Sequence, residues 1–177
     1  MSKVGYVYDE LMLLHEQYDH SECPERIKVI YNELQRRGYL NKMNKLASKR
    51  ITKEELALVH SQEYIDSIYK LFALPEKQIK AIVSKMDSMY ANKNSIVSAE
   101  VAAGSTLNLM KGILDGGIEH GVAIVRPPSH HTSRTSASGF CFFNSTMIAT
   151  KYAMNCGKRV AVVDWDINCE CLKAFRC

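Results

Sequence analysis

Uninterrupted runs of apolar residues, separated by segments with a helical pattern, constrain the fold of this chain most strongly. Residues 122–125 (Val-Ala-Ile-Val) and 160–163 (Val-Ala-Val-Val) are such runs, and residues 4–8 form a similar one near the start. Strands that are apolar throughout are typical of parallel sheets covered on both faces, whereas a strand with one wet face alternates apolar and polar residues. The sequence therefore predicts an α/β domain, with a mostly parallel sheet and helices on both faces.

Helices are predicted for the segments between these runs. Proline, glycine and capping signals place them at residues 24–38, 52–58, 65–72, 95–115 and 144–154. The long helix over 95–115 contains the segment Ala102-Ala103-Gly104-Ser105, whose side chains are all small, so another element can approach it closely. Residues 74–94 are weakly patterned and predict a loop with a short helix.

Composition is that of an ordinary globular protein. With 46% hydrophobic and 24% charged residues, the chain is neither disordered, collagen-like nor a coiled coil. Its net charge of +4 is small and scattered, so we expect no nucleic-acid binding. No apolar run approaches the roughly 20 residues that cross a bilayer, and no export signal is recognised. Six cysteines without disulfide-scaffold spacing predict reduced thiols in the cytoplasm or nucleus.

Chemistry-bearing residues directly follow two of the predicted strands. Residues 126–131 read Arg-Pro-Pro-Ser-His-His, and residues 164–166 read Asp-Trp-Asp. Because the carboxyl ends of parallel strands meet at one edge of a sheet, the imidazoles and carboxylates are expected to converge there. While the chain stays extended, Asp164 and Asp166 point to the same side. One carboxylate could then bind a metal while its neighbour orients an imidazole.

Other interpretations of these residues stay open at this point. A His-His pair in a loop is often only polar surface, and a D-x-D pattern at a strand end also fits a magnesium-dependent enzyme. The sequence contains no G-x-x-x-x-G-K-[ST], G-x-G-x-x-G or G-x-S-x-G pattern, which weakens nucleotide-binding and serine-hydrolase interpretations. The isolated histidines are expected to be structural or exposed: His15, His20, His60 and His120.

Three ordered motifs resemble the zinc-dependent histone deacetylase family, near the cytoplasmic tubulin-deacetylase branch of its class II. They are residues 126–131, residues 138–144 (Ser-Gly-Phe-Cys-Phe-Phe-Asn) and residues 163–166 (Val-Asp-Trp-Asp). Shorter matches occur at residues 20–26, 59–64, 87–90 and 102–104. The resemblance implies an arginase- and deacetylase-like α/β fold, with residues 1–167 as the N-terminal part of the catalytic domain. It also implies zinc-dependent hydrolysis of acetyl-lysine in a histone tail, tubulin or another protein, with possible co-regulator partners and no membrane.

Particular residues take their expected roles from the same resemblance. His131 corresponds to the general base and acid, and His130 to its electrostatic partner. Asp164 corresponds to the residue that orients a histidine, and Asp166 to a ligand of Zn²⁺. Gly139 and Phe140 would line the channel that holds the lysine stem, because a flat aromatic wall suits a methylene chain.

The pattern departs from the family after Ile167. The family continues into a His-His-Gly-Asn-Gly type run whose first histidine binds zinc, and Asn168 occupies that position here. An amide is a poor zinc ligand. The family's third zinc ligand and its carbonyl-polarising tyrosine come later still. We therefore expect an incomplete and inactive catalytic domain, with residues 168–177 as an aberrant tail from an alternative exon, a shifted frame or a faulty gene model.

Two further hypotheses concern this chain itself. It could be a non-catalytic fragment or pseudoenzyme that binds partners through an uncovered sheet edge. Alternatively, thiolates of the tail could rebuild a metal site with Asp166, since zinc accepts sulfur ligands. The cysteines concerned are Cys169, Cys171 and Cys177.

Overall fold

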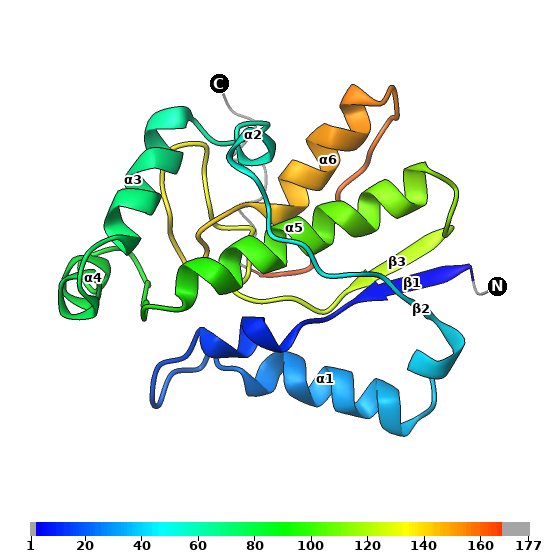
Figure 1. Ribbon diagram of the computed structural model, residues 1–177, viewed down its shortest axis with the longest axis horizontal. Helices are drawn as coiled ribbons and strands as arrows, with labels where there is room; N and C mark the ends of the chain where they lie inside the picture. Colours follow the sequence, from blue (N-terminus) through cyan, green and yellow to red (C-terminus); the bar gives the residue numbers. More distant parts are fainter. Residues whose placement is uncertain (1–2, 168–177) are drawn as a thin grey trace.

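A parallel sheet lies at the centre of the computed structural model, which describes residues 3–167 (Figure 1). Within that range the sheet has three strands in the order β2-β1-β3. The strands are β1 (Val4–Val7), β2 (Asn44–Lys45) and β3 (His120–Ala123). Both pairings are parallel, with Val4 opposite His120 and Val7 opposite Ala123. The predicted α/β class and its parallel sheet are confirmed.

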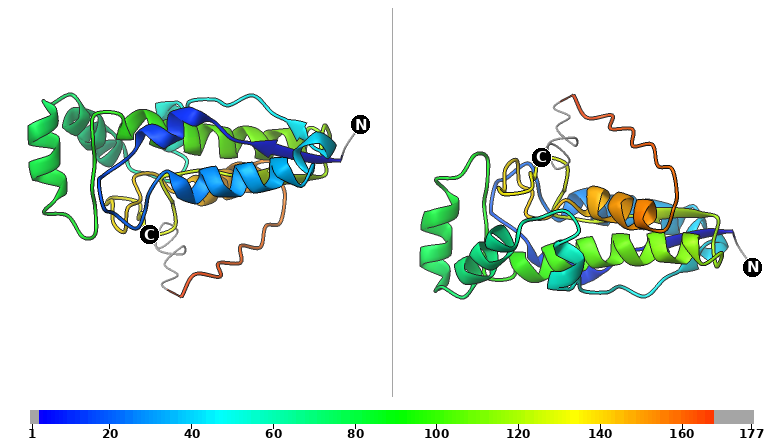
Figure 2. Two further views of the ribbon diagram at one scale, coloured as in Figure 1. Left: turned by 90° about the horizontal axis from the view of Figure 1, so that it is seen from below. Right: turned by 90° about the horizontal axis from the view of Figure 1, so that it is seen from above.

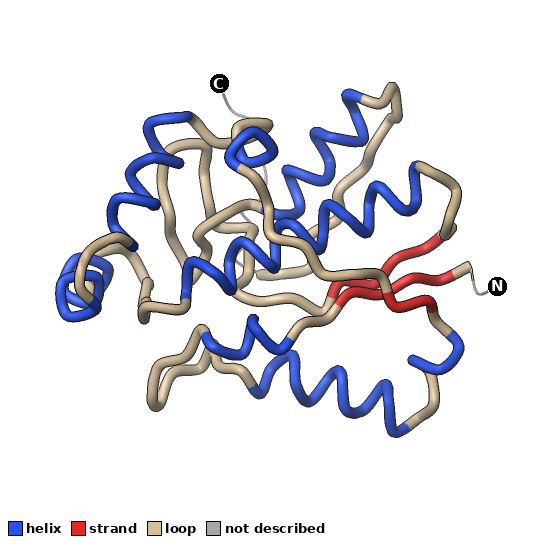
Figure 3. Tube along the Cα trace, viewed as in Figure 1, coloured by secondary structure: helices blue, strands red, loops and turns tan. Residues whose placement is uncertain are grey.

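Helices make up most of the regular secondary structure outside the sheet, and they lie close to where the sequence predicts them (Figure 3). Two short 3-10 helices are η1 (Glu10–Leu14) and η2 (Leu40–Lys42). The α-helices are α1 (Glu25–Arg36), α2 (Lys53–Leu56), α3 (Gln62–Phe72), α4 (Glu76–Val83), α5 (Ser95–Leu114) and α6 (Ser145–Asn155). The predicted capping box of Thr52 and Glu55 is present at the start of α2, and Asn144 caps α6 by accepting a hydrogen bond from the Met147 amide. No helix among residues 3–167 is both long and apolar enough to pass through a membrane.

The sheet is covered on both faces, because α1 lies on one side of the strands and α5 on the other (Figure 2). Tyr6 and Tyr8 pack with Ile27 of α1, while Val7, which points the opposite way, packs against Leu109 of α5. A larger cluster joins α3, α4, α5 and α6 to the loop that precedes α6. This second cluster fixes the loop that carries the 138–144 motif.

The small-residue segment of α5 is crossed by the chain that leads into α2, as its composition predicts. The Ile51 amide donates to the Glu100 carbonyl at 3.1 Å, and the Lys49 amide donates to Ser105 Oγ at 3.2 Å. A Cβ atom on Gly104 would lie 2.5 Å from Ile51 N and 2.6 Å from the carbonyl carbon of Arg50. Only glycine therefore allows this crossing.

Two strand predictions need correction. The strand predicted at residues 122–125 corresponds to β3, which runs over His120–Ala123. All four residues of β3 are exposed rather than buried. Residues 160–163 form no strand in the described range, and Val163 is 71% exposed. The physical reason is the same in both cases. An apolar run shows that a segment would suit a strand buried on both faces. However, residues 3–167 supply no strand next to residues 160–163, nor next to the edge of β3 that faces away from β1.

Candidate active site

Two motifs that are distant in the sequence meet beyond the carboxyl end of β3. His130 Nδ1 and Asp164 Oδ2 lie 3.0 Å apart, with side chains that are 18% and 15% exposed. A carboxylate partner favours the tautomer in which Nδ1–H donates, which leaves Nε2 as the basic atom of the ring. The structure thus brings together the imidazole and the carboxylate that the strand-end argument expects to converge.

His131 lies beside this pair. Its ring centroid is 4.1 Å from that of His130. The ring also packs against the backbone of Gly139, where a Cβ atom would lie 2.6 Å from His131 Cγ. Gly139 and Phe140 have φ values of +53° and +66°, a conformation that turns the chain sharply at this point.

These residues line one open pocket of about 530 Å³. The predicted catalytic and channel residues and the predicted zinc ligand Asp166 border it, together with further polar residues. The pocket lining includes His130, His131, Gly139, Phe140, Asp164, Asp166, Glu22, Arg26, Ser129 and Thr146. Imidazole bases, carboxylates and an aromatic wall around one opening suit proton transfer to a substrate with an apolar stem.

A fully buried arginine anchors the loop that carries both histidines. Arg126 Nη2 and Nε donate to the Glu22 carboxylate at 2.6 and 3.1 Å, and Nη1 donates to the carbonyls of Met12 and His15. The Tyr90 hydroxyl adds a 2.8 Å bond to Glu22. Burial alone would raise the pKa of Glu22, but the hydrogen bonds and charge of Arg126, with the Tyr90 hydroxyl, hold this pKa below its usual value. Glu22 is therefore a buried carboxylate that needs its cation.

The backbone of Asp87 and Ser88 supports the channel motif from the other side. The Gly139 amide donates to the Asp87 carbonyl at 3.1 Å, and the Phe140 amide donates to the Ser88 carbonyl at 2.9 Å. The exposed Asp87 carboxylate accepts a 3.0 Å bond from Ser138 Oγ. Residues 87–90 match the family, but no local signal in the sequence places Asp87 beside the channel.

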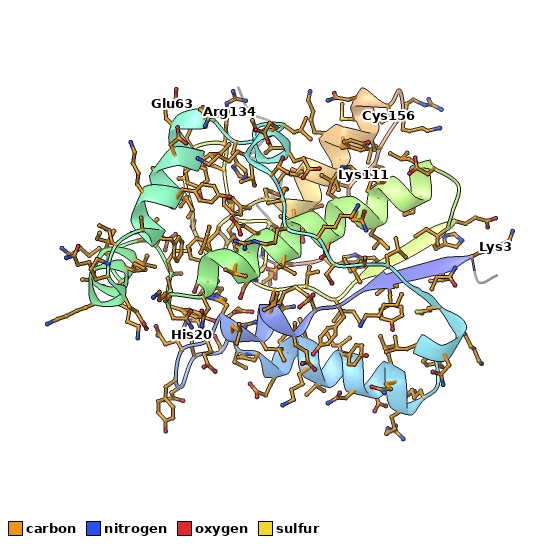
Figure 4. All side chains as sticks on the ribbon, in the orientation of Figure 1. Lys3, His20, Glu63, Lys111, Arg134 and Cys156 are labelled. Atoms are coloured by element: carbon orange, nitrogen blue, oxygen red, sulfur yellow. The ribbon has the colours of Figure 1, made fainter. Side chains whose placement is uncertain are left out.

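His20 adds an aromatic neighbour to Phe140. Figure 4 shows His20 on the loop between η1 and α1, near the N-terminal end of α5. Its ring centroid is 5.0 Å from that of Phe140 and 4.5 Å from that of Tyr90. His20 therefore packs against Phe140 at the edge of the site, which agrees with the structural role predicted for it.

His60 holds the motif loop from within the core. Its Nδ1–H donates to the Ser133 carbonyl, and its Nε2 accepts from the Asn144 amide, both at 3.0 Å. Tyr64 Oη donates to the Phe142 carbonyl at 2.7 Å. Burial lowers the pKa of His60 to about 4. Smaller effects from hydrogen bonds with the backbone of Ser133 and Arg134 act in the opposite direction. His60 is thus a neutral structural histidine, as predicted.

The buried histidines predict a loss of stability in mild acid. Burial also lowers the pKa of His15 to about 3, with the charge of Arg126 acting in the same direction. Between about pH 6.5 and pH 4 the unfolded chain binds a proton at each of these positions and the folded chain does not, so acid favours unfolding. Going from pH 7 to pH 5 is expected to lower the free energy of unfolding by about 3–4 kcal/mol for the two histidines. Urea titration at the two pH values measures this change.

Two single variants check the origin of this pH dependence. His60→Gln should remove about half of the change, because one of the two groups no longer titrates. His120→Gln, at an exposed position, should leave the change intact. A full pH dependence in His60→Gln would show that groups other than this histidine cause it.

Within residues 3–167 the site does not fit a complete zinc centre. Asp166 is exposed, and its amide donates to Asp164 Oδ1 at 3.1 Å. Among these described residues no three His, Cys, Asp or Glu side chains form a group that could hold a metal ion. A catalytic zinc site takes three protein ligands. The predictions for Asn168 and for the thiolates of Cys169, Cys171 and Cys177 lie outside the described residues.

The contact between Gly139 and His131 leads to a second prediction. Gly139→Ala should push the His131 ring out of its position and also place a side chain at positive φ, with a combined cost of about 2–4 kcal/mol. Side-chain NMR of His131 and urea unfolding measure both effects.

Gly157→Ala is the matched control for this prediction. Gly157 has φ +77° with no atom near its Cβ position, so that variant isolates the backbone cost of about 1–2 kcal/mol. Equal losses in the two variants, with an unshifted His131 signal, would contradict the packing argument.

The fold and the pocket together define an α/β protein with a histidine–aspartate site at the carboxyl edge of a parallel sheet. Residues 20–168 match the histone deacetylase domain. The chain therefore belongs to the histone deacetylase family, as its motifs predict, and this assignment favours the deacetylase interpretation over a magnesium-dependent enzyme.

Curated relatives and a solved structure show the same likeness. The chain is 36% identical to Histone deacetylase 5 of Arabidopsis thaliana, over 94% of this chain and 26% of that protein. It is 38% identical to Polyamine deacetylase HDAC10 of Rattus norvegicus, over 83% of this chain and 25% of that protein. The crystal structure of the HDA15 HD domain superposes with a TM-score of 0.78 at 32% identity, covering 89% of this chain and 45% of the solved chain. The chain thus spans about a quarter of the curated relatives' length.

Proposed function

We propose that this chain contributes the histidine–aspartate part of a site that hydrolyses the acetyl amide of acetyl-lysine in proteins. The observation that carries the proposal is the 3.0 Å contact between His130 and Asp164, with His131 alongside, at the pocket lined by Gly139 and Phe140. A relative called a histone deacetylase supports the proposed protein substrate, and another called a polyamine deacetylase supports only the deacetylation itself. Both names describe removal of an acetyl group.

The proton transfers are assigned to the two histidines from the family resemblance. His131 accepts a proton from water as the water oxygen adds to the acetyl carbonyl carbon. It then gives that proton to the amine nitrogen as the carbon–nitrogen bond breaks, so acetic acid and the free amine leave, and at neutral pH the acid passes its proton to the amine. His130, held by Asp164, acts as the electrostatic partner beside the imidazolium that forms on His131. Phe140 provides the apolar wall for the methylene stem of the substrate.

Zn²⁺ is the cofactor that the family resemblance implies, with Asp166 as one ligand. Because residues 3–167 offer no three-donor group, we propose that the chain alone has no deacetylase activity. The remaining ligands would come from the rest of a deacetylase domain. Asp166 already lines the pocket together with His130 and His131, which supports this division of the site.

The cellular setting belongs to the same proposal. We propose an acetylated protein such as a histone tail or tubulin as substrate, with no nucleic acid bound directly and possible co-regulator proteins. The cytoplasm or the nucleus is the proposed compartment. The free thiols of Cys23, Cys141 and Cys156 agree with a reducing compartment.

A chimera tests the proposed function and its substrate class. Residues 1–167 are joined to the part of the HDA15 HD domain that lies outside the structural match, and the chimera is assayed on an acetyl-lysine peptide and on mono-acetylated spermidine. The proposal predicts hydrolysis of the peptide by the chimera and none by residues 1–177 alone. Hydrolysis of the polyamine only would move the substrate class to small amines. A folded chimera that hydrolyses neither compound would contradict the proposal.

A further inference from the structure

We propose that a groove formed by α3, α4 and the loop 133–137 is a docking site for an acidic, amphipathic helix of a partner protein. We call it the α3–α4 groove, and its volume is about 490 Å³. Apolar side chains make up most of its wall: Tyr64, Ile68, Leu71, Leu74, Ile82 and Met86. None of these residues lines the histidine pocket, so the proposal does not depend on the proposed catalytic step.

The floor of the groove is rigid and its rim is exposed. Tyr64 and Ile68 of α3 are buried in the large core cluster, which fixes the floor. On the rim, Leu74 is 36% exposed and Ile82 is 44% exposed. An apolar hollow with exposed apolar side chains at its rim is typical of a surface that binds another molecule.

The groove is separate from the sheet. The helices α3 and α4 lie at the end of the molecule away from the three strands (Figures 1 and 2). Its loop wall is held within this part of the fold, because the Ser61 amide donates to the Arg134 carbonyl at 3.0 Å. Ser133 Oγ and Ser136 Oγ, 2.7 Å apart, close the same loop. The shape of the groove is therefore set by contacts among the elements that form it.

Positive charge is concentrated on the elements around the groove. Residues 70–93 contain five lysines and two acidic residues, so this segment carries +3 of the chain's net charge of +4. Lys70 lines the groove itself, and Lys85 directly precedes Met86 of the lining. In the described part of the chain Lys70, Lys77 and Lys85 are exposed and form no ion pair.

The acidic residues nearby already have partners. Glu76 forms an ion pair with Lys80 at 2.8 Å, and Asp66 of α3 forms one with Lys53 at 3.2 Å. Asp87 accepts its hydrogen bond from Ser138. Carboxylates of a partner would therefore meet lysines whose charge is not balanced locally, which favours an acidic partner over a basic or neutral one.

The apolar lining and the lysines together specify the occupant. An amphipathic helix can place apolar side chains in such a groove while acidic residues on its flanks lie beside Lys70 and Lys85. An anionic membrane would attract the same lysines, but membrane binding needs apolar side chains that protrude, and Tyr64 and Ile68 lie at the floor of a hollow. In a twofold contact between two copies of this chain, lysines would face lysines.

Selection from a random peptide library tests the proposal. Peptides of about 15 residues, long enough for a marginally stable helix, are selected on residues 1–177 and counter-selected on the variant Ile82→Asp. We expect the enriched peptides to be acidic, with apolar residues at helical spacing. Their Kd should rise at least about tenfold on Ile82→Asp, because the new carboxylate would be desolvated under the peptide. Ile82 is exposed, so the variant should fold as the parent chain does.

Charge reversal tests the electrostatic part of the proposal. The double variant Lys70→Glu with Lys85→Glu should weaken binding at least about tenfold at low salt, and much less at high salt, where the charges are screened. The matched controls are exposed residues of α1. Lys28→Glu and Ile30→Asp should each change the Kd by less than about twofold.

The other outcomes identify other occupants. Failure to enrich peptides that distinguish the parent from Ile82→Asp, or enrichment of basic peptides, would overturn the proposal. So would binding to vesicles of phosphatidylcholine and phosphatidylserine, or a dimer of this chain, that Ile82→Asp abolishes in place of peptide binding. The enriched peptides must also bind the chimera with the HDA15 HD domain, since loss of binding there would mean that the rest of such a domain covers the groove. A chimera that binds the peptides but hydrolyses no substrate would contradict only the proposed function.

Discussion

Arg126→Met should lower the free energy of unfolding by about 3–5 kcal/mol, because it leaves the Glu22 carboxylate buried without its cation. The Arg126 side chain is fully buried and that of Glu22 is 5% exposed. Since small domains are stable by only about 5–15 kcal/mol, the variant should be mostly unfolded at moderate urea concentrations. Urea unfolding followed by circular dichroism measures the loss.

Two further variants separate this effect from a general loss of contacts. Arg26→Met removes the other arginine that contacts Glu22, but its side chain is 41% exposed, so the expected loss is below about 1 kcal/mol. Adding Glu22→Gln to Arg126→Met should recover part of the stability, because the buried charge is then removed. A double variant no more stable than Arg126→Met alone would show that packing, and not the unpaired charge, causes the loss.

Gly104→Ala should cost about 2–4 kcal/mol, because the new methyl group collides with main-chain atoms that cannot rotate away. These atoms belong to Arg50 and Ile51, where the chain crosses α5. The cost appears even though alanine favours a helix over glycine by about 1 kcal/mol. Thermal unfolding of the purified variant measures it.

Gly112→Ala is the control on the same helix. Its new methyl group would lie 2.9 Å from Cδ2 at the end of the Leu46 side chain, which can rotate, and at an ordinary contact distance of 3.7 Å from Ile118. The gain in helix propensity, about 1 kcal/mol, should then offset most of the strain. If both variants lost the same stability, the close approach at Gly104 would not be the reason for glycine there.

Much of the fold follows from local sequence patterns. Caps and periodicity locate α2, α5 and α6, and the small residues around Gly104 predict the crossing that the structure shows. The residues 160–163 show the limit of such patterns. Four consecutive apolar residues indicate a segment that would suit a buried strand. A strand also needs a neighbouring strand to pair with, and residues 3–167 provide none beside residues 160–163.

The residues of the site likewise include some that sequence patterns predict and some that they do not. The convergence of His130 and Asp164 is predicted from two apolar runs treated as neighbouring parallel strands. The contact is present, although residues 160–163 form no strand in the described range. Glu22 and Asp87 could not be assigned, because their partners are distant and no local pattern points to them. Glu22 meets Arg126 across 104 positions of the sequence, and Asp87 meets Ser138 across 51. The roles of His131 and Asp166 stay predictions from the family resemblance.

The most direct measurement is the rate of acetyl-lysine hydrolysis by the chimera of residues 1–167 with the remaining HDA15 HD domain, with and without His131→Ala. If this chain supplies the proton-transferring histidine, the variant should be slower by about 10²–10⁴-fold, while His120→Ala at an exposed position keeps full activity. A chimera whose rate is unchanged by His131→Ala, or hydrolysis by residues 1–177 without a partner, would contradict the account.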